Sequence, residues 1–335
     1  MQNKYLFWIE FISIFLLATL ATSALAETVV LAVPGPGSLS YLPVYLAKAL
    51  AADKAEGLEL KLRYVGGGPV ALRDLNEKNC DFVAVGLAAM AAGRADGIPV
   101  VAIGQLSQTA MYTFLLRADL KNQIHTIAQL KGRRIGATSS TSRTRSMGHM
   151  MVEYLLNRAG VNLDDVQFVS VGQNRETQRA ALASGTVDAV MGDEPFASEI
   201  VAQGVAVKLA DLYLPAKSNE LLGGSVIHAA LATSEEVIAQ NPETVKKMLR
   251  LYDYTLQWIA QHTTRELIEK LSDLPGFVPE QQKLLASILQ RNQGMYPKNV
   301  AWDKRAVATT EQFFHNTATK QSEKDLLFSD FVLNP

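Results

Sequence analysis

A short residue pattern that occurs twice constrains the fold more than any other feature of this chain. In the first copy, NCDFVAVG, a turn and an Asp precede a short apolar run that ends at Gly86. In the second, SGTVDAVMGDEP, Asp188 precedes the apolar run and Gly192 ends it. A helix-like periodic pattern comes before each copy, at Val70–Glu77 and at Thr177–Ala183. A helix followed by a short buried strand, repeated far along the chain, predicts two similar lobes.

Short β-like runs alternate with helical patterns along most of the chain, which predicts an α/β fold with largely parallel sheets. The expected strands are Thr28–Val33, Leu58–Val65, Phe82–Val85, Val100–Ile103, Tyr112–Arg117, Arg134–Ala137, Gln167–Val171, Ala189–Met191, Val205–Leu209 and Ser225–Leu231. From Ser234 onward the patterns are helical, and we expect this tail to pack on the first lobe. The expected organisation is a first lobe over 27–116, a second lobe over 117–213, and a return to the first lobe over 214–335.

The N-terminal residues have the features of a cleaved export signal. Lys4 precedes an apolar stretch from Phe11 to Leu20, and Ala24-Leu25-Ala26 fits the cleavage rule for signal peptides. The apolar stretch is shorter than the ~20 residues that a membrane-spanning helix needs. No cysteine follows the cleavage site, so we expect a free periplasmic protein that starts at Glu27 rather than a lipoprotein.

Composition and motifs argue against several classes of function. The formal net charge is −1, which gives no reason to expect nucleic acid as a partner. Cys80 is the only cysteine of the sequence, so the chain cannot form an internal disulfide. The histidines have no metal-like spacing, and no G-x-S-x-G motif is present. We therefore expect no metal, no cofactor and no catalytic residue, with His228 as an ordinary packed residue of an apolar strand.

Loops that follow strands are the expected place for ligand contacts, because open α/β sheets bind ligands at the carboxyl ends of their strands. After the first strand, Ser38 and Ser40 could cap the next helix or contact a ligand, and Tyr41 could stack on the ligand or act as a packed lid. The segment Gly66–Gly68 matches a dinucleotide fingerprint only weakly. It is better interpreted as a glycine turn whose backbone approaches a small ligand, or as a tight turn alone.

A run of hydroxyl residues, ATSSTSRTR, follows another strand and opens a long helix pattern. The N-terminus of a helix favours an anion, and Arg143 or Arg145 could pair with an acidic group. Alternatively, one hydroxyl caps the helix and both arginines are solvated. The acids Asp193 and Glu194 would repel an anion, so either one of them points outward, or they bind a cationic or donor group, or they contact the opposing lobe on closure. The expected ligand-binding residues are Ser38, Ser40, Tyr41, Gly67, Gly68, Gly86, Leu87, Ser139, Ser140, Thr141, Ser142, Arg143, Asp193 and Glu194.

Three segments resemble a known family: LKGRRIGATSSTS, MMVEYLLNRAGVNLDDVQFVSVG and ALASGTVDAVMGDEP. They are similar to the periplasmic substrate-binding proteins of nitrate/sulfonate/taurine-type ABC uptake systems, which share their fold with thiamine-precursor binding and synthesis proteins. The resemblance implies a type II periplasmic binding fold and an ABC permease of the inner membrane as partner. Met191-Gly192 departs from the family, which often has a tryptophan there, and this puts the common sulfonate specificities in doubt.

The sequence as a whole predicts a monomeric, non-enzymatic protein that captures a small organic ligand and delivers it to a permease. The expected ligand is anionic, a sulfonate, a carboxylate or a similar compound. One alternative is a pyrimidine or thiamine-precursor binding or synthesis protein of the same fold. A synthetic enzyme would need a histidine in the cleft, and none is expected at a strand-end loop. The other alternative is a ligand-sensing partner of a membrane receptor.

Overall fold

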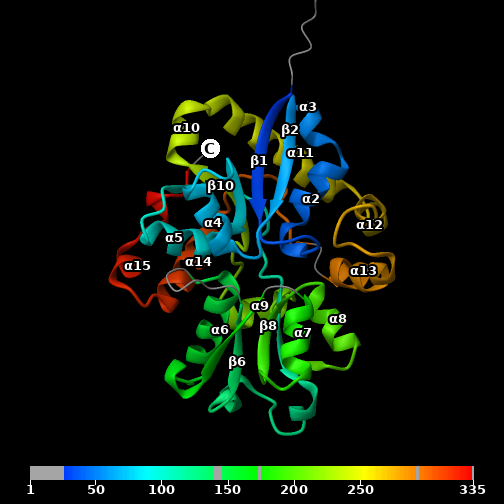
Figure 1. Ribbon diagram of the computed structural model, residues 1–335, viewed down its shortest axis with the longest axis vertical. Helices are drawn as coiled ribbons and strands as arrows, with labels where there is room; N and C mark the ends of the chain where they lie inside the picture. Colours follow the sequence, from blue (N-terminus) through cyan, green and yellow to red (C-terminus); the bar gives the residue numbers. More distant parts are fainter. Residues whose placement is uncertain (1–25, 139–144, 173–174, 292–293, 334–335) are drawn as a thin grey trace, which may run out of the picture.

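The computed structural model describes residues 26–138, 145–172, 175–291 and 294–333. It has two lobes, which lie one above the other in Figure 1. Each lobe is built on a five-stranded sheet, with the strand order β2-β1-β3-β10-β4 in the first lobe and β7-β6-β8-β5-β9 in the second. The two orders are equivalent, so the two lobes that the repeated pattern predicts are present. The α/β class is also confirmed.

The elements have the following bounds. The first sheet contains β1 (Glu27–Val33), β2 (Leu58–Tyr64), β3 (Phe82–Gly86), β4 (Val100–Gln105) and β10 (Ala229–Ser234), and the second contains β5 (Tyr112–Arg117), β6 (Arg134–Thr138), β7 (Gln167–Val171), β8 (Ala189–Asp193) and β9 (Ala206–Asp211). The helices up to the second crossing are α2 (Leu42–Ala49), α3 (Ala52–Ala55), α4 (Gly68–Asn76), α5 (Leu87–Ala95), α6 (Met147–Arg158), α7 (Arg175–Ala183), α8 (Phe196–Ala202) and α9 (Pro215–Leu222). The tail adds α10 (Glu235–Gln240), α11 (Pro242–Gln261), α12 (Thr264–Leu271), α13 (Gln282–Arg291), α14 (Lys304–Thr317) and α15 (Gln321–Asp325).

Both sheets are mixed rather than largely parallel. Strand β5 is antiparallel to β8 and β9, and β10 is antiparallel to β3 and β4, whereas the other pairs are parallel. These two strands are the first that the chain forms after each crossing between the lobes. Each of them therefore begins at the edge of its sheet that faces the other lobe and runs away from it.

The lobe boundary at residue 116 is wrong. Residues 112–116 were expected in the first lobe, but β5 pairs with β8 and β9 of the second sheet. The first crossing is the segment 106–111 between β4 and β5, and the second is the segment 212–228 between β9 and β10. The two crossings are joined by a hydrogen bond of 3.0 Å from the His228 N–H to the Ser107 carbonyl. An apolar run predicts a strand but does not identify the sheet that the strand joins.

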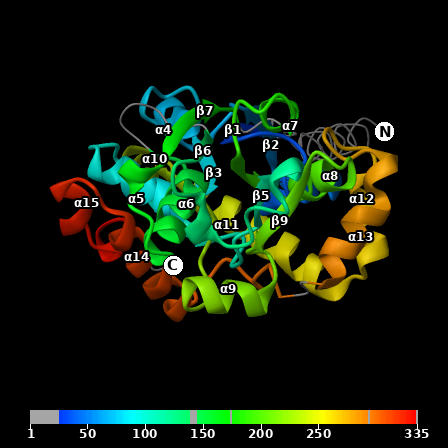
Figure 2. The same ribbon diagram turned by 90° about the horizontal axis from the view of Figure 1, so that it is seen from below.

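The helical tail contacts both lobes instead of only the first. Helix α11 packs on α2 and α3, and α14 packs on α5 of the first lobe and on α6 of the second. Seen from below, α12 and α13 lie on the opposite side of the molecule from α15 (Figure 2). Beyond these helices, Val332 forms an isolated parallel bridge with Ala102 of β4, where no strand was expected.

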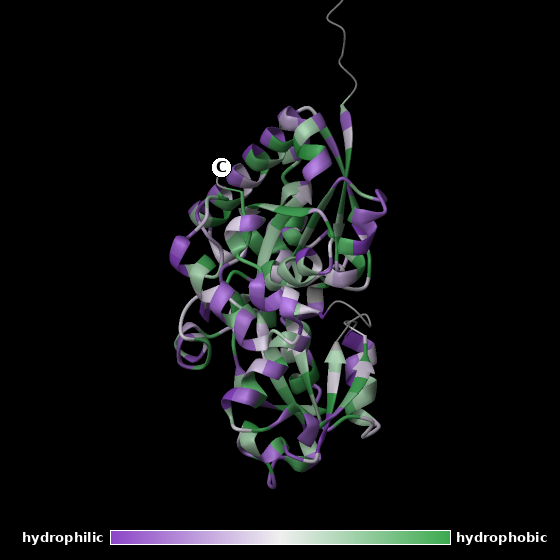
Figure 3. Cartoon of the chain, turned by 90° about the vertical axis from the view of Figure 1, so that its left-hand side faces the viewer, coloured by the Kyte–Doolittle hydropathy of each residue, from purple (hydrophilic) through white to green (hydrophobic). Residues whose placement is uncertain are grey.

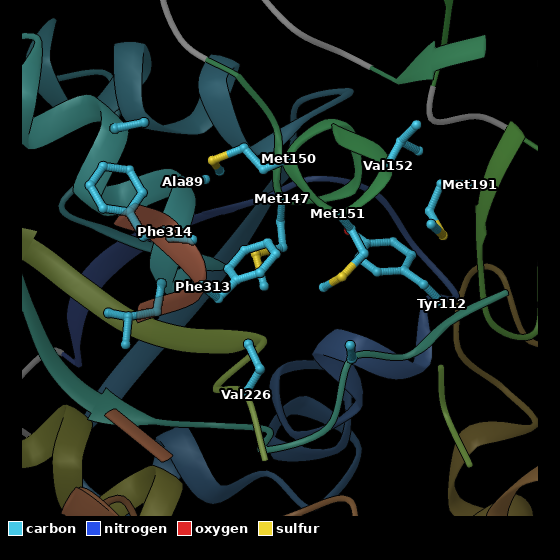
Figure 4. Packing of buried hydrophobic residues seen from close by; sticks show 14 of the residues in the cluster. Ala89, Tyr112, Met147, Met150, Met151, Val152, Met191, Val226, Phe313 and Phe314 are labelled. Atoms are coloured by element: carbon cyan, nitrogen blue, oxygen red, sulfur yellow. The ribbon is translucent and has the colours of Figure 1, made fainter. Parts of the chain in front are cut away.

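Burial follows the strands and the inner helix faces, and hydrophilic residues gather on the outer helices (Figure 3). One apolar cluster extends across the two lobes, and Figure 4 shows Met147 and Met150 of α6 close to Phe313 and Phe314 of α14. Cys80 is buried, and burial raises the pKa of its thiol to about 12, as expected for a small core residue. Among the described residues, no helix is both long enough and apolar enough to cross a membrane.

Candidate ligand-binding site

A cleft of about 400 Å³ lies between the two lobes. Its volume is within the range of pockets that bind small organic molecules. The cleft is surrounded by residues from both sheets, from the loops after the parallel strands and from the C-terminal tail. They are Pro34, Gly35, Pro36, Ser38, Tyr41, Tyr64, Gly66, Tyr112, Arg175, Glu176, Gln178, Met191, Asp193, Phe196, Gly276, Val278 and Gln281.

Asp193, at the end of β8 in the second lobe, is hydrogen-bonded to two serines of the first lobe. Ser38 Oγ donates to Asp193 Oδ2, and Ser40 Oγ donates to Asp193 Oδ1 at 2.8 Å. The backbone N–H of Leu39 adds a bond of 2.9 Å to the Glu194 carbonyl. Of the three arrangements open for the acids, Asp193 therefore adopts the contact with the opposing lobe.

Ser38 also has the capping role that the sequence left open. Its Oγ accepts a hydrogen bond of 3.1 Å from the Ser40 N–H and so caps the 3₁₀ turn η1 (Leu39–Tyr41). Helix α2 follows directly, and its own N-cap residue, Tyr41, makes no side-chain cap bond. One hydroxyl therefore both shapes the loop after β1 and joins it to the second lobe.

The carboxyl group of Asp193 is held near its point of half-ionisation at neutral pH. Burial raises its pKa from 3.8 to about 7, against the opposing effect of the bonds from Ser38 and Ser40. The neighbouring charge of Glu194 raises the pKa further. The carboxyl group thus changes its charge near neutral pH. Residues with strongly shifted pKa values are often found at functional sites.

Glu194 is fully buried and is not among the residues that line the cleft. Thr113 Oγ1 donates to its Oε1 at 2.5 Å, and the backbone N–H of Ser198 donates to its Oε2 at 3.3 Å. Burial raises the pKa of Glu194, and these hydrogen bonds lower it. Glu194 therefore anchors the start of α8 inside the second lobe. Its expected place among the ligand contacts is not supported by this arrangement.

Arg175 is a cationic residue of the cleft wall, and nearby carboxylates already compensate its charge. Its Nη1 lies 2.6 Å from Glu199 Oε2, and its Nε lies 3.2 Å from Glu176 Oε1. Its guanidinium carbon also lies 6.0 Å from the centre of the Phe196 ring. The described part of the wall is mainly aromatic and aliphatic, with Tyr41 and Tyr64 from the first lobe and Tyr112 and Phe196 from the second.

The glycine positions serve packing more than the cleft. Gly66 lines the cleft, but Gly67, Gly68, Gly86 and Leu87 do not. A Cβ at Gly68 would lie 3.6 Å from the Val85 side chain, so this residue packs α4 on β3. A Cβ at Gly86 would lie 2.9 Å from Met147 Cβ, and Leu87 is fully buried. The end of β3 therefore packs against α6 of the opposing lobe.

Only part of the segment ATSSTSRTR can be compared with its predicted role. Ser139, Ser140, Thr141, Ser142 and Arg143 lie outside the described residues, so their role stays a prediction. Arg145, the other candidate, is engaged by the protein itself. Its guanidinium donates to Glu153 of α6, to Glu323 Oε2 at 2.9 Å and to the Thr317 carbonyl at 2.7 Å. These bonds tie the start of α6 to the C-terminal tail.

Several cleft residues were missed by the sequence analysis. Tyr64 ends β2 and Arg175 comes shortly after β7, so the strand-end rule could have identified both. Tyr112 begins the antiparallel strand β5, and its place at the cleft requires knowledge of the strand direction. Gly276 and Val278 come from the helical tail, which carried no signal of a ligand site. No cluster of potential metal ligands occurs among the described residues.

His228 also differs from its expected position inside a strand. It directly precedes β10, which begins at Ala229, and it is fully buried. Its ring makes edge-on contacts with Tyr112, at a centroid distance of 4.7 Å, and with Tyr41, at 6.1 Å. The sequence analysis expected no histidine at a strand-end loop, but His228 contacts two tyrosines of the cleft wall.

Comparison with protein-family models identifies the family of this chain. The family model described as NMT1/THI5 like matches residues 39–265, which is more than half of the chain. The chain belongs to the NMT1/THI5-like family. Among individual relatives, the protein named "Putative binding protein YtlA" from Bacillus subtilis (strain 168) is 27% identical over 267 residues, which are 78% of this chain and 75% of YtlA.

Solved structures show the fold that this member of the NMT1/THI5-like family adopts. A protein of Bordetella bronchiseptica RB50 superposes with a TM-score of 0.82 at 20% identity, over 92% of this chain and 95% of its own. The alkanesulfonate-binding protein SsuA from Xanthomonas axonopodis pv. citri, bound to MOPS, has a TM-score of 0.73 at 17% identity, over 93% and 99%. The two-lobed periplasmic binding fold expected from the sequence is thereby confirmed.

Proposed function

We propose that the chain is exported, loses residues 1–26, and acts in the periplasm as the solute-binding protein of an ABC uptake system. It captures a small organic ligand between its lobes and delivers it to an inner-membrane permease. The family supports this proposal, and relatives such as YtlA are named as binding proteins.

The observation that carries the proposal is the composition of the cleft wall. Tyr41 and Ser38 come from the first lobe, Tyr112 and Asp193 come from the second, and the lobes meet through the bonds from Ser38 and Ser40 to Asp193. Neither lobe alone completes this site. A ligand that touches both walls favours the closed arrangement through the contacts that it makes only there.

The proposed ligand is an organic anion such as a sulfonate or a carboxylate. In the sequence, the hydroxyl run and Arg143 precede α6, and the start of a helix favours an anion, which supports this class. The related fold of SsuA, an alkanesulfonate-binding protein, supports it further. The apolar and aromatic wall favours an anion with an organic body over a bare inorganic ion such as nitrate.

A thermal-shift screen of the mature protein tests the ligand class. The panel consists of alkyl and aryl sulfonates, carboxylates, nitrate and pyrimidines. A compound that binds only the folded protein must raise the melting temperature, by an amount that grows with its concentration. We expect organic anions to raise the melting temperature and nitrate to have no effect.

Deletion of the gene tests the transport role. It should reduce uptake of the compound that the screen identifies, and normal uptake in the deletion strain would overturn this role.

A further inference from the structure

Arg175 brings a positive charge to the cleft wall. Of the described residues that line the cleft, it alone is cationic, whereas Glu176 and Asp193 are acidic. It is the first residue of α7, and Glu176 and Gln178 of the same helical turn also line the cleft. The start of a helix favours negative charge, because its first N–H groups have no partners within the helix. Arg175 thus combines a full positive charge with the end of a helix that favours an anion.

Neighbouring side chains hold the guanidinium of Arg175 in place. Its Nη1 donates to Glu199 Oε2 at 2.6 Å, and its Nε donates to Glu176 Oε1 at 3.2 Å. The guanidinium carbon lies 6.0 Å from the centre of the Phe196 ring, close enough for a weak attraction between a cation and a ring. Because these contacts orient the guanidinium before a ligand arrives, binding costs less conformational entropy.

Part of the guanidinium is still available to a ligand. A guanidinium has five N–H donors, and its bonds to described residues are the two to Glu176 and Glu199. The side chain of Arg175 is 35% exposed, so the group is accessible from the cleft that it lines. Arginine often binds an acid group through two parallel hydrogen bonds, which are stronger than bonds between neutral groups.

The nearby acids are all paired within the protein. Glu176 also accepts from Arg179 Nε at 3.1 Å, so two arginines balance the charges of Glu176 and Glu199. Glu199 does not line the cleft. Both carboxyl oxygens of Asp193 accept hydrogen bonds from serines of the first lobe. An acid group in the cleft would therefore meet Arg175 without facing an unpaired carboxylate.

We propose that Arg175 is a ligand-binding residue of the cleft, and that its guanidinium, held by Glu199, pairs with the acid group of the solute. This inference rests on the proposed solute-binding function and names the residue that recognises the negative charge. It differs from the expectation drawn from the sequence, in which Arg143 or Arg145 has this role.

Matched pairs of charged and uncharged compounds test the recognition of charge. The series runs from ethanesulfonate to hexanesulfonate and from propanoate to hexanoate, and each acid is paired with its uncharged sulfonamide or carboxamide. Calorimetric titration of the mature protein measures the affinities. We expect at least one acid to bind at least tenfold more tightly than its amide. Binding of amides alone, or of no member of the series, overturns the inference.

Substitution assigns the preference for the acid to a residue. Arg175→Gln should abolish the preference, because a neutral side chain cannot form the ion pair. Arg179→Gln is the matched control and should keep it, since this arginine of the same helix also pairs with Glu176 but does not line the cleft. An unchanged preference in Arg175→Gln overturns the inference. Loss of the preference in Arg143→Gln but not in Arg175→Gln overturns it as well, because the acid group would then lie at the hydroxyl run.

A second variant keeps the inference testable if the Arg175→Gln protein is unstable. Arg175→Gln leaves Glu199, which is only 7% exposed, without its cation, and a buried charge without its partner is destabilising. The double variant Arg175→Gln/Glu199→Gln removes both charges together. We expect it to bind the amides like the wild type and the acids no more tightly than the amides. A double variant that still prefers the acids overturns the role of Arg175.

Mass spectrometry of the molecule released from protein purified from its own periplasm separates this inference from the proposed function. A retained solute without an acid group overturns the role of Arg175 and leaves transport standing. Normal uptake in the deletion strain overturns transport, and the titrations with acids and amides still decide the role of Arg175.

Discussion

At the scale of single residues, the contact between Ser38, Ser40 and Asp193 is the clearest link between local structure and function. Both hydroxyls donate to one carboxyl group across the cleft. Ser38→Ala and Ser40→Ala should therefore each weaken binding of the screened compound, since a lost bond to a charged group costs about 1.5–3 kcal/mol. Isothermal titration measures the change.

Ser234→Ala provides the matched control for these two variants. Ser234 caps α10 by accepting from the Val237 N–H at 3.2 Å, away from the cleft wall. Its removal should cost about 1 kcal/mol of stability and leave affinity unchanged. If all three variants bind equally well, the bonds to Asp193 contribute nothing to closure.

The titration of Asp193 predicts how the stability of the closed protein depends on pH. The pKa rises from 3.8 to about 7, mainly through burial, so the folded protein holds a proton that the unfolded chain has released. Stability should therefore fall as pH rises from about 4 to 7, by at most about 1.4 kcal/mol per pH unit for this group. Asp193→Asn should reduce that slope. Glu194 and Glu199 have raised pKa values as well, so part of the slope should remain.

Thermal melts of wild type and Asp193→Asn, recorded with saturating ligand at several pH values, measure this difference. The ligand keeps both proteins closed, so the comparison concerns the Asp193 carboxyl group. Parallel slopes for the two proteins would mean that Asp193 does not titrate in this range.

At the scale of secondary-structure elements, the sequence predicted the strands better than their directions. The runs at 112–117 and 167–171 match β5 and β7 residue for residue, because alternating or continuous apolar residues report burial. The direction of β5 and β10 depends on which lobe the chain has just left, and no local pattern encodes this. The strand-end rule consequently found Ser38 and Asp193 but could not find Tyr112 and His228, which lie at strand beginnings.

The link between α6 and the tail predicts a large effect of one arginine on stability. Arg145 donates to Glu153, Glu323 and the Thr317 carbonyl, and the two carboxylate side chains are only 7% and 1% exposed. Arg145→Gln leaves two buried carboxylates without their cation, which should cost about 3–5 kcal/mol. Urea denaturation measures the loss.

A more exposed ion pair serves as the comparison. The side chains of Arg250 and Glu56 pair at 2.8 Å and are 55% and 22% exposed, so Arg250→Gln should cost far less stability than Arg145→Gln. Equal losses for the two variants would show that the Arg145 network contributes no more than a surface pair.

At the scale of the whole molecule, the two crossings are the natural hinge. They comprise residues 106–111 and 212–228, and hydrogen bonds between Ser107 and His228 or Ala229 hold them together. The first crossing precedes β5, and the second precedes β10. Rotation about these segments would separate Ser38 and Ser40 from Asp193 and open the cleft without disturbing either sheet.

Gly86 allows the closure of this hinge to be tested directly. A Cβ at this position would lie 2.9 Å from Met147 Cβ of the other lobe, a distance that side-chain carbons do not tolerate. We expect ligand to decrease the radius of gyration of the wild type. Gly86→Ala should therefore keep the lobes apart, weaken ligand binding and prevent that decrease. Gly68→Ala is the control, since its Cβ would meet Val85 of the same lobe at an ordinary 3.6 Å. Small-angle scattering with and without ligand measures closure, and a compact liganded Gly86→Ala would mean that the lobes close without the approach of α6 to β3.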